Sequence, residues 1–461
     1  MNDFDPANAT QSSAVVENST TGSEEGGNSK RQKILPKTLE SKSFAIKDFE
    51  GNKEDQEDYI ANTMATYKKN LTDRSEHQLG YPFNLEYDYK DLNQLMPFSI
   101  NNIGDPFIGG DCGNHSRPFE VGVLDWFAEF MKIEKNEYWG YITSCGTEGN
   151  FHGILTGRKM FPNGILYASK ESHYSIAKAI DMFSMKWVQV ETQVSGEIDY
   201  HDFKTKLLAN KEFPAIVVAN IGMVFVVGTT MKGAVDDIDF IIQILKEGGI
   251  SQDRFYIHCD GALSGILLPF MECEKKVISF KKPIGSASIS GHNFIGCPIT
   301  CGVLITRKDY INFHSRNIEY IASQDATIMG SRNGHAPIFL WHALNREGCK
   351  LIQKQVEECL KNARYLKGCL CKAGISAMLN ESSIIVVFER PKDEELIRKW
   401  QLASQGNVSH VVVMPHVSVA MLNTFLDELI SKRLTWYKDE IPPCLEVDIG
   451  KENCTCALHK C

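Results

Sequence analysis

Phe255-Tyr256-Ile257-His258-Cys259-Asp260-Gly261-Ala262 is an apolar run that ends in an aspartate and two small residues. Further short apolar runs lie at 165–168 and 215–219, and helical patterns such as those at 121–131 and 150–158 alternate with them. Short apolar runs rich in β-branched residues, separated by helices, are typical of a mostly parallel sheet that helices cover on both faces. The sequence therefore predicts a large three-layer α/β domain.

Two other regions have patterns of their own. A helical region at 338–374 precedes apolar runs at 384–388 and 410–414 and a helix at 419–432, an order that predicts a small α+β domain. Apolar residues at helical spacing between 56 and 71 predict an amphipathic helix that packs on a partner subunit or on the chain's own core. We therefore divide the chain into a disordered polar tail (1–37), an N-terminal helical or dimerisation segment (38–118), the large α/β domain (119–334), the small C-terminal α+β domain (335–436) and a cysteine-rich tail (437–461).

The composition argues against several classes of protein. The 461-residue chain has a net charge of −9 and no basic stripe, so we expect no nucleic-acid partner. It has no apolar run long enough to cross a bilayer and no signal-peptide pattern, so we expect a cytoplasmic protein without a membrane partner. Its fourteen cysteines lie mostly in core-like segments and are expected to be reduced thiols.

Five blocks carry the residue types that a catalytic site needs. They are Ser144-Cys145-Gly146-Thr147-Glu148-Gly149-Asn150, Glu171-Ser172-His173-Tyr174-Ser175, His258-Cys259-Asp260-Gly261-Ala262, Ser286-Ala287-Ser288-Ile289-Ser290-Gly291-His292-Asn293 and Gly330-Ser331-Arg332-Asn333-Gly334. Gly146 and Thr147 stand at a turn into a helix, which is either an anion site or an ordinary helix cap. Asp260 follows an apolar strand and precedes small residues, which favours a site carboxylate over a solvated loop aspartate.

In this order and at these separations, the blocks resemble the group II pyridoxal-phosphate (PLP) dependent amino-acid decarboxylases. The resemblance is closest to their plant branch, the serine decarboxylases or histidine decarboxylase-like proteins, and runs from about Leu79 to the C-terminus. It implies a fold type I PLP-dependent transferase-like large domain, PLP as cofactor, and a homodimer with shared active sites. It also implies an amino-acid substrate, with serine first and histidine or another small amino acid next.

The resemblance implies a role for each candidate site residue. Asp260 would pair with the ring nitrogen of PLP, and His173 would stack on the ring. Tyr320 would return a proton to the substrate carbon after CO2 leaves. The remaining implied residues are Gly146, Thr147, Ser290 and His292 around the phosphate, Thr230 and Ala262 beside the cofactor, Ser331 and Arg332 from a neighbouring subunit, and Tyr81 in the substrate pocket. His115 belongs to a stretch, 112–115, where relatives usually carry a tyrosine, so we expect it in an altered lining of the substrate pocket.

The chain departs from this family at the position that binds the cofactor covalently. The family has a lysine after the histidine of the Ser-x-x-Gly-His block, and this chain has Asn293. An amide cannot form the covalent bond that a lysine amine forms with an aldehyde. A second departure is the segment 223–228, which interrupts the family pattern Asn-Ile-Gly-Thr-Thr either as a real insertion or as an error in the gene model.

These departures leave different functions open. The first is a serine decarboxylase-like carboxy-lyase, which converts L-serine to ethanolamine and CO2 and is impaired by Asn293. The second is a catalytically silent decarboxylase-like pseudoenzyme that binds a ligand or modulates a subunit. A repurposed catalyst with His292 or His173 as base is a more distant third.

The C-terminal tail contains a separate cluster of metal-ligand types. Cys444, Cys454, Cys456, His459 and Cys461 lie within one short stretch, and thiolate and imidazole groups suit tetrahedral zinc. The spacing is not that of a familiar zinc finger. The cluster is therefore either a structural zinc clip or a set of reduced surface thiols.

Overall fold

The computed structural model describes residues 44–49, 51–222, 231–271, 276–438 and 440–458. Contacts divide the chain into two units, 1–72 and 73–461. Helix α1 (Lys53–Ser75) forms most of the described part of the first unit and has no buried residue. The expected helix is thus present, but within the described residues its apolar side chains Ile60 and Met64 are exposed and do not join a core. Packing on a partner subunit stays a prediction.

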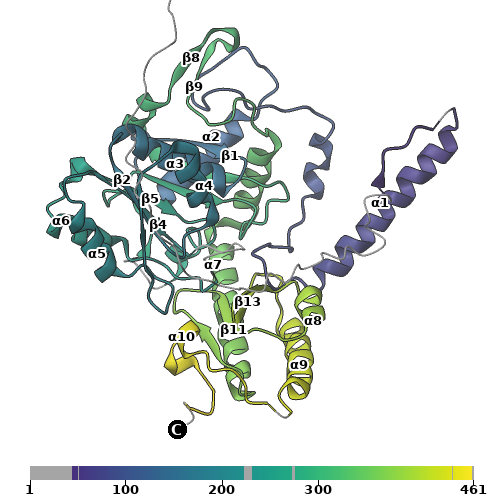
Figure 1. The fold of residues 1–461 in the computed structure, drawn as a ribbon. Helices are drawn as coiled ribbons and strands as arrows, with labels where there is room; N and C mark the ends of the chain where they lie inside the picture. Colours follow the sequence, from purple (N-terminus) through teal and green to yellow (C-terminus); the bar gives the residue numbers. More distant parts are fainter. Residues whose placement is uncertain (1–43, 50, 223–230, 272–275, 439, 459–461) are drawn as a thin grey trace, which may run out of the picture. The chain divides into compact units, whose positions relative to one another are not determined.

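A seven-stranded sheet organises the second unit (Figure 1). Its strands are β1 (Tyr138–Thr143), β2 (Ile165–Ser169), β3 (Trp187–Val190), β4 (Ala215–Asn220), β5 (Phe255–Asp260), β6 (Ser286–Ser290) and β7 (Gly302–Arg307), in the spatial order β1-β7-β6-β5-β4-β2-β3. Strand β7 runs antiparallel to β1 and β6, and the other neighbouring pairs are parallel. The predicted mostly parallel sheet is confirmed, and the carboxyl ends of its parallel strands meet at one edge.

Helices cover both faces of this sheet. Alternate strand residues point to opposite faces, so the apolar strands present an apolar surface on each side that the helices bury. Helices α3 (Gly146–Met160) and α4 (Tyr174–Phe183) cover one face, and α5 (Tyr200–Ala209) and α6 (Ile238–Glu247) cover the other. The first face buries Ile154 and Ile176 of the helices with Leu166, Ile216 and Tyr256 of the strands; the second buries Phe203 and Ile241 with Tyr167, Val217 and Ile257. Helix α2 (Arg117–Phe130) packs against β1 and against the long helix α7 (His335–Lys372).

Helix α3 lies close to the sheet because two of its residues have no side chain. A Cβ atom on Gly149 would lie 2.2 Å from the Ser288 Oγ, and one on Gly153 would lie 2.2 Å from the His258 Nδ1. Any larger residue would push the helix away from β5 and β6. The close approach sets Asn150, which lies between these glycines, against the carboxyl end of β5.

The C-terminal part forms a small domain around a four-stranded antiparallel sheet in the order β10-β11-β13-β12. Its elements are α7 (His335–Lys372), β10 (Ala377–Leu379), β11 (Ile385–Glu389), α8 (Glu394–Lys399), β12 (Ala403–Gln405), β13 (Val408–Val412), α9 (Val419–Trp436) and α10 (Glu446–Ile449). A positive φ of 60° at Gly348 interrupts α7. The sequence predicted α7, β11, β13 and α9, but not β10, β12 and α8, which are too short to give a periodic pattern.

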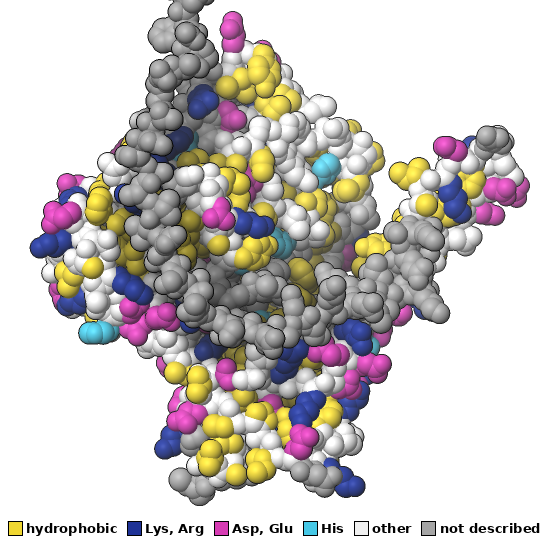
Figure 2. Space-filling model, in the orientation of Figure 1, with side chains coloured by type: hydrophobic (Ala, Val, Ile, Leu, Met, Phe, Trp, Pro, Cys, Tyr) yellow, Lys and Arg dark blue, Asp and Glu magenta, His cyan; other side chains and the backbone are white. Residues whose placement is uncertain are grey.

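The remaining elements are short. They are the hairpin strands β8 (Arg316–Ile318) and β9 (Ser323–Asp325), and the 3₁₀ helices η3 (Lys90–Leu95), η4 (Gln252–Arg254), η5 (Leu268–Phe270), η7 (Lys308–Phe313), η8 (Glu319–Ile321) and η9 (Lys451–Asn453). On the face that Figure 2 shows, basic and acidic side chains of the described residues are interspersed. A search of the described helices finds none long and apolar enough to cross a membrane.

Candidate active site

A pocket of about 200 Å³ opens at the carboxyl edge of the large sheet. Its walls come from the first turns of α3 and α4 and from the residues that follow β5 and β6. The residues that line it are Cys145, Gly146, Thr147, Asn150, His173, Tyr174, Ala262, Ser290 and His292. Four separate sequence blocks therefore converge where parallel α/β sheets commonly bind ligands.

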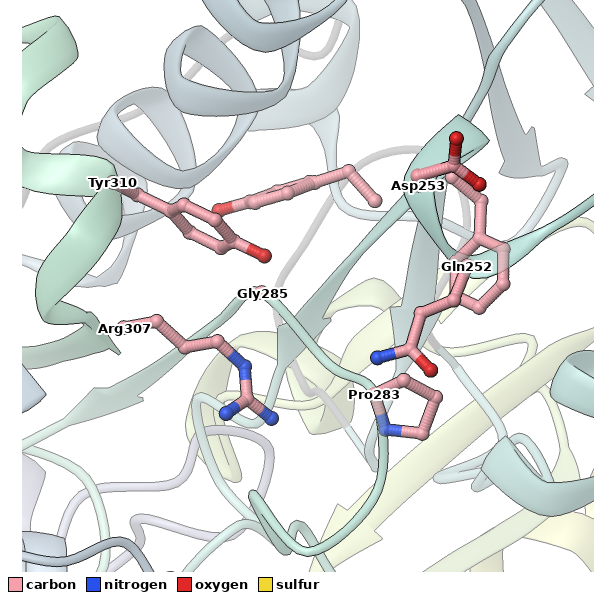
Figure 3. Close-up of a pocket in the computed structure, with 8 residues that line it drawn as sticks. Gln252, Asp253, Pro283, Gly285, Arg307 and Tyr310 are labelled. Atoms are coloured by element: carbon pink, nitrogen blue, oxygen red, sulfur yellow. The ribbon is translucent and has the colours of Figure 1, made fainter. Parts of the chain in front are cut away.

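A second, larger hollow of about 430 Å³ lies at the opposite, amino end of β5 (Figure 3). Arg307, Tyr310 and Asp253 are among its lining residues, and the predicted site residues are not. The Arg307 guanidinium is already held there, because it donates hydrogen bonds to the carbonyl oxygens of Ile284 (2.9 Å) and Phe280 (2.8 Å). We take the smaller pocket as the candidate active site, because the predicted site residues line it.

Asp260 lies beneath this pocket at the end of β5. Its side chain is fully buried, and its carboxylate accepts hydrogen bonds from the Asn150 amide (2.6 Å) and from the backbone N–H of Ala262 (3.3 Å). Burial raises the pKa of Asp260 to about 7 from 3.8, and these two hydrogen bonds offset part of that rise. A positive charge in the pocket would stabilise the ionised carboxylate, so the position suits a partner that carries a cation.

His173 forms the N-terminal cap of α4 on the wall of the same pocket. Its Nδ1 accepts the backbone N–H of Ser175 (3.2 Å) and lies 2.7 Å from the Ser175 hydroxyl. Burial lowers the pKa of His173 to about 4, with a smaller contribution from Lys178. The imidazole is therefore neutral near pH 7.

Asn150 links Asp260 to His173, and the sequence did not single it out as a site residue. Its amide nitrogen donates to Asp260 and to the Ser175 hydroxyl (2.9 Å), so its oxygen accepts from His258 Nε2 (3.0 Å). Burial lowers the pKa of His258 to about 3, which keeps this histidine neutral. One signal was available: Asn150 is a polar residue that directly follows the first turn of a helix packed on the sheet.

The start of α3 can receive an anion. Gly146 and Thr147 belong to the first turn of a 15-residue helix, where backbone N–H groups have no intrahelical acceptor. A Cβ atom on Gly146 would lie 2.7 Å from the Ser290 Oγ, so the missing side chain leaves a hollow next to a hydroxyl. His292 is half-buried beside them, and its Nδ1 lies 2.8 Å from the carbonyl oxygen of Cys301. These groups can surround a phosphate.

Asn293 is fully buried and is not among the residues that line the pocket. Its amide nitrogen donates to the carbonyl oxygen of Ala262 (3.1 Å). Its Oδ1 has no hydrogen-bond partner within the described part of the chain. Among the described residues, the pocket lining contains no lysine.

Three predicted residues lie outside the pocket of their own chain. Tyr320, in η8 between β8 and β9, is 87% exposed. Tyr81 is half-buried and stacks on Phe83. His115 is half-buried and accepts the backbone N–H of Arg117 at 3.3 Å. Their catalytic and substrate-binding roles stay predictions.

Arg332 and Ser331 also lie away from the pocket lining. The resemblance implies that a neighbouring subunit contributes Arg332 and Ser331, and that role stays a prediction; in this chain the Arg332 guanidinium is buried in an ion pair with Glu120. A buried carboxylate needs such a cation, so this arginine is engaged inside its own chain, where it also donates to the carbonyl oxygen of Gly104 (2.9 Å). Ser331 is exposed and accepts from the Asn101 amide at 3.1 Å.

Thr230 and the segment 223–228 lie outside the described residues, as do His459 and Cys461 of the tail. Their predicted roles stay predictions.

Comparison with known proteins places this pocket in context. The family model "pyridoxal-dependent decarboxylase conserved domain" matches residues 116–390. Serine decarboxylase 1 of Oryza sativa subsp. japonica is 59% identical over 441 residues, which cover 95% of this chain and 90% of the relative. Histidine decarboxylase of Solanum lycopersicum is 52% identical over 402 residues, which cover 86% of this chain and 95% of the relative.

Solved structures show the same fold at lower identity. L-methionine decarboxylase of Streptomyces sp. 590 has a TM-score of 0.76 and 24% identity, with 85% of this chain and 98% of that chain covered. Glutamate decarboxylase of Lactobacillus brevis CGMCC 1306 has a TM-score of 0.66 and 16% identity, with 87% and 95% covered. The predicted fold class, a mostly parallel α/β domain with a small α+β domain, is confirmed.

Proposed function

The chain belongs to the pyridoxal-dependent decarboxylase family, and we propose that it is a PLP-dependent carboxy-lyase that converts L-serine to ethanolamine and CO2. The choice of serine is supported by the 59% identity to a serine decarboxylase over nearly the whole chain. Histidine or another small amino acid is the second choice, because a relative named histidine decarboxylase is 52% identical.

The observation that carries this proposal is the buried carboxylate of Asp260 under a pocket that the predicted residues line. When bound, PLP supplies the electron sink that receives the bonding electrons of the departing carboxylate. Asp260 would keep the ring nitrogen protonated, since its raised pKa falls again once it faces a cation. His173 would cover the ring as a neutral imidazole.

The phosphate would lie at the start of α3. The backbone N–H groups of Gly146 and Thr147 and the Ser290 hydroxyl would donate to an anion there. Ala262, also in the lining, is small enough to let a ring approach Asp260. The residues that hold the cofactor thus fit PLP, whereas the residue that would bind it covalently does not.

We infer that PLP is held without a covalent bond, because Asn293 has no amine and no lysine occurs among the described lining residues. Loss of a nucleophile typically costs several kcal/mol of barrier, so turnover would be slow.

The predicted homodimer also stays a proposal. Its support is the exposed Tyr320, whose predicted proton transfer requires a pocket other than that of its own chain. The cytoplasmic location predicted from the sequence stays a proposal too.

The proposed reaction is tested with the full chain, added PLP and L-serine labelled in the carboxyl group. We expect slow release of labelled CO2 above the rate of PLP alone, an equal amount of ethanolamine, and a lower rate with L-histidine. The exposed-surface variant Asp253→Asn, at the other end of β5, should behave like the original chain. A chain that binds PLP and releases no CO2 above the PLP background contradicts the proposal and favours the silent pseudoenzyme.

A further inference from the structure

We propose that the C-terminal tail holds a structural Zn²⁺ ion on the sulfur atoms of Cys444, Cys454 and Cys456. The three Sγ atoms all lie within 4.8 Å of one another, and those of Cys444 and Cys454 are 4.0 Å apart. Zinc–thiolate bonds of about 2.3 Å at tetrahedral angles place sulfur atoms about 3.8 Å apart. The sulfurs therefore need only a small contraction to become three ligands of one tetrahedral ion.

The surroundings of the sulfurs suit thiolates. The backbone N–H of Leu445 points to the Cys454 Sγ at 3.3 Å, and such a donor stabilises a negative sulfur. Cys454 and Cys456 are buried, while Cys444 remains exposed, so an ion could enter from that side. Thiolates prefer soft or borderline metals such as zinc over magnesium or calcium.

A disulfide explains the same geometry less well. A disulfide joins two sulfurs at about 2.0 Å and would leave the third cysteine unused. Here three sulfurs from two segments of the tail, one before α10 and one after η9, lie close together. They supply three of the four positions of a tetrahedral ion.

The ion would fasten the tail to the small domain. Around the cysteines, Thr455 donates its hydroxyl to the carbonyl oxygen of Gly374 (2.9 Å) and its backbone N–H to the Ser376 hydroxyl (2.9 Å), just before β10. Leu445, the N-cap of α10, and Ile449, its last residue, are fully buried. A bound metal that links Cys444 to Cys454 and Cys456 would stabilise this packing further.

One experiment uses the full chain, purified with a reducing agent and without chelator. We expect about one zinc per chain by elemental mass spectrometry. Alkylation supplies the matched control within the same molecule, because Cys444 and Cys349 are both exposed. Zinc should protect Cys444 from iodoacetamide at least tenfold relative to the chelator-treated chain, and Cys349 should react equally in both.

Variants give a second readout. Cys454→Ser and Cys456→Ser should lose the zinc, and Cys349→Ser should retain it. In the original chain, replacing zinc with Co²⁺ should give the thiolate-to-metal absorption of a tetrahedral site. This measurement needs no variant, so it tests the proposal even if a variant fails to fold. The proposal is overturned if the chain binds no metal after incubation with excess zinc. It is also overturned if zinc does not protect Cys444, or if Cys444 and Cys454 are found joined in a disulfide.

Discussion

Replacing Asn293 with lysine is expected to raise kcat/KM for CO2 release from L-serine by about a hundredfold or more. Asn293 is fully buried, and its amide already contacts the carbonyl oxygen of Ala262, a residue of the pocket wall. A lysine side chain is longer and could pass this wall to reach the pocket. Desolvation would lower the pKa of its ammonium group, so a larger fraction would be the nucleophilic amine. The rate is measured with carboxyl-labelled serine.

Asn293→Met is the control for this variant, because methionine has a similar length and no amine. Equal rates for Asn293→Lys and Asn293→Met would show that the amine is not what the chain lacks. If Asn293→Lys is inactive, the same substitution is made in a chain without residues 223–228, which restores the family pattern Asn-Ile-Gly-Thr-Thr. Recovery of activity there would assign the remaining loss to the inserted segment.

Asp260→Asn is expected to weaken PLP binding by about a hundredfold or more, roughly 3 kcal/mol. The substitution keeps the shape of the side chain and an acceptor for Asn150, but removes the charge that would face the ring nitrogen. The dissociation constant of PLP is measured by equilibrium dialysis. Asp253→Asn, which makes the same change on an exposed residue at the other end of β5, should leave it unchanged. Equal PLP affinities for Asp260→Asn and the original chain would remove Asp260 from the site.

The same variant should be more stable than the original chain when PLP is absent. Burial raises the pKa of Asp260 to about 7, so ionising it is costlier in the folded state than in the unfolded state. The stability of the original chain therefore falls as pH rises from about 4 to about 7, and asparagine has no such dependence. Denaturant unfolding should show Asp260→Asn to be more stable by about 1 to 4 kcal/mol at pH 8 and nearly equal at pH 4. Lower stability at pH 8 would contradict the raised pKa.

The sequence predicted the large domain well, because β4 and β5 are short runs buried on both faces and give a clear pattern. It failed where elements are short or where tertiary contacts decide. Strands β10 and β12 have three residues each, too few for a period to appear. The buried ion pair of Arg332 with Glu120 joins residues far apart in the chain, and no local pattern indicates it.

The site was predictable in its parts and not in its connections. Gly146, His173 and Ser290 were predicted separately, and the structure brings them to one pocket. Asn150 was missed because its importance lies in holding Asp260 and Ser175 at the same time, which only the packing of α3 on β5 reveals. Tyr320 is exposed in this chain, so its predicted role depends on a contact that a single chain does not contain.

The central claim is that the PLP cradle is present and the covalent link is absent. The most direct test incubates the original chain with PLP, reduces half of the sample with borohydride, and measures bound cofactor after dialysis and by intact mass. We expect PLP to be removed by dialysis and the borohydride-treated chain to gain no mass, whereas Asn293→Lys should gain one PLP adduct at position 293. An adduct of one PLP per original chain, mapped to a single lysine such as Lys232, whose charge interacts with that of Glu171 near His173, would contradict the claim.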